Sequence, residues 1–363
     1  MGEIQSAQVV LFYLFDIAES VDLSAVPALI GGPTVPARLT TKPATPAYVQ
    51  YDRPPLSFEG EPLSTTLGDF HVRYRAYDYG VLSIALTRPV TGTWADLVLL
   101  SQTLVENEEM ERRAEELAIS VIGRLRRALV NHHDIHLSED YLVVLVHELM
   151  ARQTSVELLA AHGVEIAAIV RGERQRLSDQ EREAILGHRL SYLDDDLVVP
   201  TWNAAFVYDT PMGAQAALEI LEFANSQLLQ FRYYDERLDA ELASIYARVQ
   251  KPRWVDQWIG SRHTRNARQI HALFIDVTEI TDRTANAIKF TGDIYAARLF
   301  ALVAGRLGLE GWKASVDRKL ETLDDIYRFA VEQSSMARGQ LLELMVVAIL
   351  VFELILLFLG VMH

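Results

Sequence analysis

Three histidines and an aspartate stand close together in the stretch "NHHDIH", as His132, His133, Asp134 and His136. Imidazole nitrogens and carboxylate oxygens are common ligands of zinc and other transition metals. The stretch is also typical of a polar loop after a helix that ends near Leu129, and we favour that interpretation. The three histidines are therefore weak metal candidates, and we predict neither a metal site nor a cofactor.

Two further patterns could support hydrolysis. The run "LDDDL", Asp194 to Asp196, could bind a hard cation, but it lacks the alternating ligands and the glycine of a calcium loop. "HELMA" begins like a zinc-protease motif at His147, but Ala151 stands where the second histidine is required. A membrane-associated, metal-dependent hydrolase that uses His132 and His136, or Asp194–Asp196, is the alternative function.

A basic cluster with interleaved tryptophans stands out in the stretch "KPRWVDQWIGSRHTRNARQ". Such a cluster could bind RNA, a lipid head group or an acidic partner surface. Ion pairs with the chain's own acids are the favoured interpretation, and Asp235 is a candidate partner for one of the arginines. The residues of this candidate anionic-partner patch are Lys251, Arg253, Arg262, His263, Arg265 and Arg268.

Composition excludes several classes of function. The formal net charge of −15 argues against a general attraction of the whole molecule to nucleic acid or to anionic lipid. The chain contains no cysteine, which excludes disulfides, thiolate zinc sites, iron–sulfur clusters and cysteine nucleophiles. No specific small-molecule substrate follows from the sequence.

The elements that must position these residues change in character along the chain. Nine of the 12 prolines precede residue 90, and they separate short alternating runs such as "QVVLFYLFDI" and "HVRYRAYDYGVLSIALTRP", which indicate strands. A helix with mixed charges follows, with Thr93 as its N-cap. "DYLVVLVHEL" indicates another strand, and "SDQEREAILG" a capped helix. We predict a mixed α/β domain with a small antiparallel or mixed sheet over residues 1–205.

The pattern becomes helical after Pro211. Apolar residues alternate three and four apart from Leu221 to Val249, with Asp235 as the one charged residue at these heptad positions. A second long helix is expected over 256–307, and a third from about 312. The heptad pattern of the third helix continues to Leu341. Residues 206–340 are therefore predicted to form a coiled-coil-like helical stalk, so that the fold class is α+β.

The last segment, 341–362, is predicted to be a transmembrane helix. It would be about 33 Å long, against roughly 30 Å of hydrocarbon. Its 16 Leu, Ile, Val and Phe residues favour insertion by about 5–10 kcal/mol, and one central carboxylate opposes it by about 3 kcal/mol. Arg328 and Arg338 precede the segment, which predicts a single-pass tail anchor in a bacterial inner membrane with the large domain in the cytoplasm.

Two glutamates lie inside this apolar segment. Glu343 is close to its start, and Glu353 is close to its middle. An acid within a bilayer usually faces protein, so we predict that Glu343, Glu353 and Gly360 lie on a face that contacts other membrane helices. Because the chain offers one such segment, the predicted partner is a second copy.

"YDYGVLSIALTRP", "LEILEFANSQLLQFRYYDERLDAELASIY" and "KLETLDDIYRFAVEQSSMARGQLLELMVVAILVFELILLF" together resemble the required-for-meiotic-nuclear-division family. The resemblance extends from about residue 50 to the end. It implies a membrane protein that forms homo-oligomers and supports translation of membrane proteins, with the ribosome or another protein as partner. It implies no catalytic residues.

The predicted function is accordingly a non-enzymatic, membrane-anchored scaffold or tether that forms homo-oligomers. Support of translation or of membrane-protein assembly is the wider role that the resemblance implies.

Overall fold

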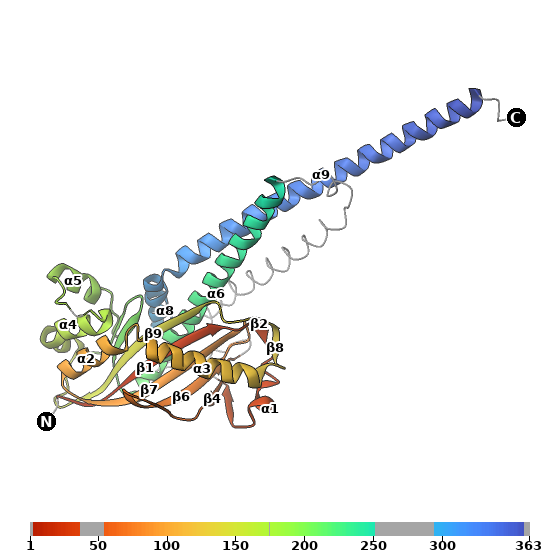
Figure 1. Ribbon diagram of the computed structural model, residues 1–363. Helices are drawn as coiled ribbons and strands as arrows, with labels where there is room; N and C mark the ends of the chain where they lie inside the picture. The colour runs from red at the N-terminus through yellow and green to blue at the C-terminus, as the bar shows by residue number, and fades with distance from the viewer. Residues whose placement is uncertain (1–2, 37–53, 174, 251–293, 359–363) are drawn as a thin grey trace. The chain divides into compact units, whose positions relative to one another are not determined.

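The computed structural model describes residues 3–36, 54–173, 175–250 and 294–358 (Figure 1). The chain divides into two compact units. Unit 1 contains Met1–Tyr233 and Ile280–Lys313, and unit 2 contains Tyr234–Glu279 and Ala314–His363. The predicted domain boundaries, after residues 205 and 340, stay a prediction.

Unit 1 is built on a nine-stranded sheet with the order β10-β11-β9-β1-β7-β6-β4-β3, and β5 pairs with β6. Every strand pair is antiparallel except β11 with β9, which is parallel. The sheet is mixed, as predicted, but larger than the small sheet expected. Its strands are β1 (Ile4–Asp16), β3 (Thr34–Pro36), β4 (Leu56–Glu59), β5 (Leu63–Thr65), β6 (Gly68–Ala76), β7 (Val81–Gly92), β9 (Ser138–Leu149), β10 (Leu197–Pro200) and β11 (Ala204–Tyr208). A separate pair joins β2 (Ala18–Val21) to β8 (Leu129–His132).

The central strand β1 is apolar on both faces because helices cover both. Its odd-numbered residues, such as Leu11 and Phe15, belong to one hydrophobic core with residues of α2 (Trp94–Leu104), α3 (Glu108–Leu125) and α4 (Ser155–Arg171). The short helices α1 (Val26–Ile30) and α5 (Asp179–Gly187) complete this layer. Thr93 and Thr154 begin α2 and α4 with capping boxes, in which side chain and backbone satisfy each other's polar groups.

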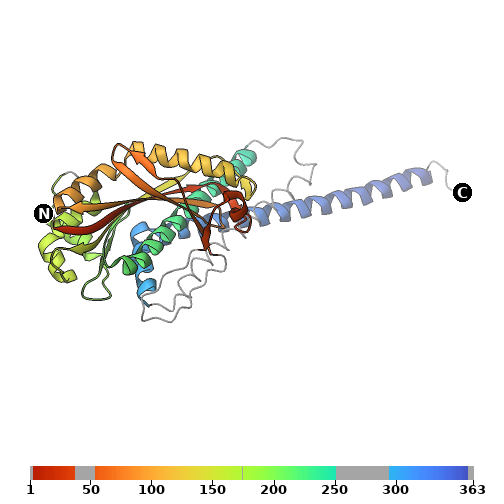
Figure 2. The ribbon, with the colours of Figure 1, turned by 90° about the horizontal axis from the view of Figure 1, so that it is seen from below.

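The opposite face of the sheet meets α6 (Pro211–Gln250) and α8 (Ile294–Leu307). Figure 2 shows α3 and α8 on opposite sides of the strands. Phe223 of α6 and Phe300 of α8 pack with ring centroids 5.8 Å apart. This layer also contains buried polar side chains, among them Asp16 at the end of β1 and Gln230 of α6, whose Nε2 donates to Asp16 Oδ1 at 3.4 Å.

Within unit 2, the distal part of α6 is paired with α9 (Leu309–Phe358), a helix of 50 residues. Leu238 of α6 and Leu320 of α9 are buried there. The arginines of the basic cluster lie outside the described residues, so the predicted pairing of Asp235 with one of them stays a prediction. Among the described residues, Asp235 accepts from Lys319 Nζ at 2.7 Å and from Ser315 Oγ at 2.8 Å. The charged residue in the heptad pattern is therefore satisfied by the neighbouring helix.

The predicted transmembrane helix over 341–362 is wrong. Among the described residues, none of the helices combines the length and the apolar character that a membrane crossing requires. Residues 341–358 are instead the distal end of α9, continuous with earlier turns that carry charges, and Glu343 and Glu353 interrupt their apolar residues. The finding also overturns the single-pass tail anchor and the inner-membrane localisation.

Candidate functional site

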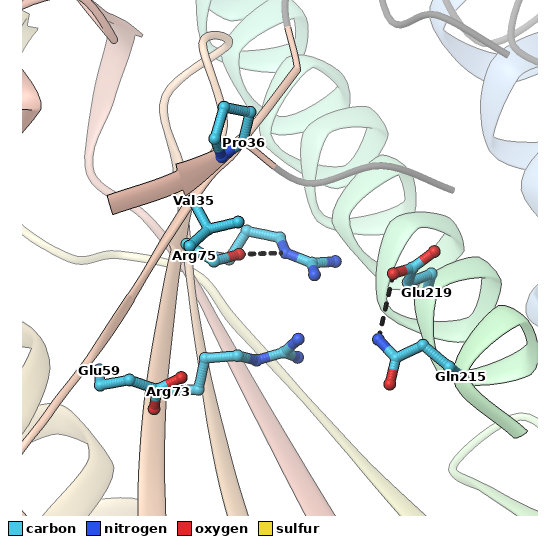
Figure 3. A pocket seen from close by; sticks show the side chains of 8 residues that line it. Val35, Pro36, Glu59, Arg73, Arg75, Gln215 and Glu219 are labelled. Atoms are coloured by element: carbon cyan, nitrogen blue, oxygen red, sulfur yellow. Dashed lines mark hydrogen bonds between the residues drawn. The ribbon is translucent and has the colours of Figure 1, made fainter. Parts of the chain in front are cut away.

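A cavity of about 580 Å³ lies in unit 1, where strands β3, β4 and β6 face helix α6 (Figure 3). Most of the side chains that line it are polar or charged, and they come from both the sheet and the helix. They are Val35, Pro36, Ser57, Glu59, Arg73, Arg75, Gln215 and Glu219.

Strand geometry brings the sheet residues together. Arg73 and Arg75 are two positions apart on β6, so both point to the same face, whereas Val72 and Tyr74 join the hydrophobic core on the other. The antiparallel register places Ser57 of β4 opposite Arg75, and Glu59 opposite Arg73. On α6, Gln215, Glu219 and Glu222 follow at intervals of four and three, which places them on one side of that helix.

Both arginines bind one buried carboxylate. Arg73 Nη2 lies 2.9 Å and Arg75 Nη1 lies 2.8 Å from the same oxygen, Oε2 of Glu222. The side chain of Glu222 is 1 % exposed and that of Arg75 is 5 % exposed, but that of Arg73 is 21 % exposed. Burial by itself would raise the pKa of Glu222, and the two guanidinium groups outweigh it, so that the pKa is lowered. Glu222 is therefore an anion held between two cations.

The two walls of the cavity carry opposite charges. The guanidinium groups of Arg73 and Arg75 point from the sheet towards α6, and Gln215 and Glu219 face them from the helix (Figure 3). Arg75 Nε donates to Ser57 Oγ at 3.0 Å, and Gln215 Nε2 donates to Glu219 Oε1 at 3.1 Å. Guanidinium donors lie on the sheet side, together with the carboxylate of Glu59, and the acceptor Glu219 lies on the helix side, which suits a small ligand with two unlike polar ends.

The predicted histidine cluster begins at His132, the last residue of β8, and does not line the cavity. His132 Nδ1 is 2.9 Å from the carbonyl oxygen of Ile17, and His133 Nε2 is 3.2 Å from Asp16 Oδ2. His133 also stacks on His136, with ring centroids 6.3 Å apart. Within the described parts of the chain, no group of three or more histidine, aspartate or glutamate side chains is arranged to hold a metal ion.

The aspartate run and His147 have structural roles. Asp196 is 1 % exposed and accepts from the backbone N–H groups of Tyr192 and Leu193, at 2.6 and 3.1 Å. The Asp195 carboxylate accepts from Arg152, so the run is a turn held by its own hydrogen bonds. His147 is 2.7 Å from Gln8 Nε2 and 3.0 Å from the carbonyl oxygen of Asp209.

The remaining predicted site residues are only partly within the described chain. The whole basic patch, Lys251, Arg253, Arg262, His263, Arg265 and Arg268, lies outside the described residues, as does Gly360. Glu343 and Glu353 are both in α9, and Glu353 is exposed. The membrane span in which they were placed is contradicted, and their predicted contact with other helices stays a prediction.

The cavity residues belong to none of the motifs predicted from the sequence. Two arginines alternate with apolar residues in "HVRYRAYD", and this pattern is a signal for a site. In a strand that is buried on both faces, an arginine without a partner would cost much free energy. Glu222 gives no local signal, since its partners are on a strand far away in the sequence.

Comparisons with known proteins identify a family but no activity. Residues 6–215 match the family described as "Uncharacterized protein MJ0711, N-terminal domain". The uncharacterized protein MJ0711 of Methanocaldococcus jannaschii is 22% identical over 192 residues, which are 53% of this chain and 58% of that protein. The chain thus spans little more than half the length of this relative. The resemblance to the required-for-meiotic-nuclear-division family stays a prediction.

No solved structure matches the chain. The family match covers more than half of its residues, including β6 and the start of α6. The chain therefore belongs to the MJ0711 N-terminal domain family.

Proposed function

We propose that the protein is a non-enzymatic scaffold that forms homo-oligomers through the distal part of α9. A run of exposed apolar side chains on that helix supports the proposal. Each of them is 53–60% exposed in the single chain: Val346, Val347, Ile349, Leu350, Val351 and Leu354.

The arrangement of these residues favours several neighbouring helices. At 100° per residue the six positions cover an arc of about 200° around the helix, which is broader than the stripe of a two-stranded coiled coil. Identical helices side by side would cover such an arc from two directions, as in a bundle of three or more copies. A second copy is the partner we propose because an apolar arc of this kind is complementary to itself and carries few charges that would select a different surface.

Glu353 falls within the same arc. A parallel bundle would bring this carboxylate of every copy close to its equivalents, so that it opposes association instead of stabilising it. Replacing Glu353 with leucine should therefore strengthen the oligomer, whereas a new charge at Leu350 should weaken it.

The mass of the purified full-length chain in solution tests the proposal, by light scattering and sedimentation across a dilution series. We expect a trimer or larger oligomer for the wild type, a shift to monomer for Leu350→Glu, and a tighter oligomer for Glu353→Leu. Leu99→Glu is the matched control, because Leu99 is also exposed but lies on α2. A monomeric wild type, or a Leu350→Glu variant of unchanged mass, would contradict the proposal.

The alternative, a metal-dependent hydrolase, receives no comparable support from the described geometry of His132, His136 or Asp194–Asp196. Support of translation or of membrane-protein assembly, with the ribosome or another protein as partner, stays a prediction from the family resemblance.

A further inference from the structure

We propose that the cavity between β6 and α6 binds a small amino-carboxylate, a ligand with one carboxylate and one ammonium group. The carboxylate would bind on the side of Arg73 and Arg75, and the ammonium group on the side of Glu219 and Gln215. This site is in unit 1 and is independent of the self-association proposed for α9.

Arg73 is the principal carboxylate-binding residue. A guanidinium group has five N–H donors, and Arg73 uses one of them on Glu222 at 2.9 Å. It is also the more exposed of the two arginines, and it points into the cavity (Figure 3). A planar guanidinium group held in one orientation can bind a carboxylate through two parallel hydrogen bonds. Because Glu222 already fixes Arg73, little side-chain freedom is lost when the ligand binds.

The charges around the cavity select a ligand with two opposite charges over a polyanion. Two arginines face the cavity, but Glu59 and Glu219 also line it, and Glu222 of α6 pairs with both arginines. A phosphate-rich ligand would meet three carboxylates in the same site, and their repulsion would offset the attraction of the arginines. A single carboxylate at Arg73 with an ammonium group at Glu219 matches both walls.

The volume of the cavity and its apolar wall further restrict the ligand. A volume of about 580 Å³ lies within the usual range for small-molecule sites. Val35 and Pro36 form an apolar side of the cavity above the arginines (Figure 3). An amino acid or dipeptide with an apolar side chain would fit this wall.

The test uses the full-length protein and pools of the common amino acids and simple dipeptides, screened by saturation-transfer NMR and followed by calorimetry. We expect at least one amino-carboxylate to bind, and its analogues without the amine or without the carboxylate to bind about tenfold more weakly or less. Inorganic phosphate is the competing probe. Binding of phosphate in preference to every amino-carboxylate would overturn the proposal.

Variants assign the binding to this cavity. Arg73→Met should weaken binding by about tenfold or more, and Arg73→Lys, which keeps the pairing with Glu222, should retain part of it. Glu219→Gln should weaken amino-carboxylates but not their analogues without the amine. Arg112→Met, at an exposed arginine of α3, is the control. If no pool binds, or if Arg73→Met remains folded by circular dichroism and binds like the wild type, the proposal is wrong.

Discussion

Arg75 on β6 and Glu222 on α6 form a buried ion pair, with 2.8 Å between guanidinium nitrogen and carboxylate oxygen. Arg73 binds the same oxygen, so a single carboxylate joins two residues of strand β6 to helix α6. A buried charge without a partner costs several kcal/mol, whereas here the charge of Glu222 is balanced by two guanidinium groups at its Oε2 atom. The contact therefore fixes the position of the strand relative to α6 and orients the side chains of the cavity.

Removing the carboxylate should destabilise unit 1 strongly. Glu222→Ala leaves two guanidinium groups facing each other without a shared anion, and we expect the free energy of unfolding to fall by about 3–5 kcal/mol. Urea denaturation followed by circular dichroism measures this loss. Glu116→Ala is the control, because Glu116 forms an exposed pair with Arg112 and should cost less than about 1 kcal/mol. Equal losses of unfolding free energy in the two variants would show that the buried ion pairs stabilise the protein no more than the exposed pair does.

The same carboxylate predicts a dependence of stability on pH. The folded state lowers the pKa of Glu222 below its unfolded value, since the attraction of Arg73 and Arg75 exceeds the effect of burial. Its contribution is therefore fully present above the unfolded pKa of about 4.5 and is lost as the pH falls through the folded pKa.

Comparison with Glu222→Gln isolates this contribution from that of the other acids. The difference in unfolding free energy between wild type and variant should be constant near neutral pH and should shrink below about pH 4.5. A difference that does not change with pH on acidification would mean that Glu222 keeps its ordinary pKa in the folded state.

Gly80 provides a steric prediction for the turn between β6 and β7. Its φ is +87°, and a Cβ atom there would lie 1.7 Å from the carbonyl oxygen of Ala18. Gly80→Ala should therefore cost several kcal/mol, from strain and displacement of the β2 backbone. Gly123→Ala is the matched control on α3, where a Cβ meets nothing within 4 Å, and it should stabilise by about 0.5–1 kcal/mol. Thermal unfolding of both variants distinguishes the two effects.

The local elements were predictable where one pattern dominates. The apolar runs that become β1 and β9 and the caps at Thr93 and Ser178 were recognised from residue type and spacing. The helix expected after Thr93 is in fact two, because Glu106 adopts a φ of 52° between α2 and α3 without any glycine or proline to signal it. Such a turn is fixed by tertiary packing, which local propensity does not contain.

The size of the sheet and the cavity depended on long-range pairing. Strands β3 and β5 have only three residues each, too few to show a reliable period. Glu222 is 149 residues away from Arg73 in the sequence. Only the packing of α6 against the sheet brings Glu222 to Arg73 and Arg75. The prediction over 341–362 was based on summed side-chain hydrophobicity, but the described helices include none that could cross a membrane.

Lys319 on α9 contacts two acids of α6, and we expect them to stabilise the helix pair of unit 2 unequally. Its Nζ lies 2.7 Å from both Asp235 Oδ1 and Asp239 Oδ2. Partial burial would lower the pKa of Lys319, but the hydrogen bonds to the two aspartates raise it. The side chain of Asp235 is only 14% exposed, and that of Asp239 is 61% exposed, so solvent screens the second contact much more than the first.

We expect Asp235→Ala to destabilise the helix pair by about 1.5–3 kcal/mol, and Asp239→Ala by less than about 1 kcal/mol. Hydrogen exchange of the amides around Leu238 and Leu320 reports this local opening separately from the unfolding of unit 1. In a Lys319→Met background the effect of Asp235→Ala should change, because its partner is already absent, and a double-mutant cycle measures that coupling. If the two alanine variants exchange alike, or if the cycle shows no coupling, the pair with Asp235 does not stabilise the helix pair.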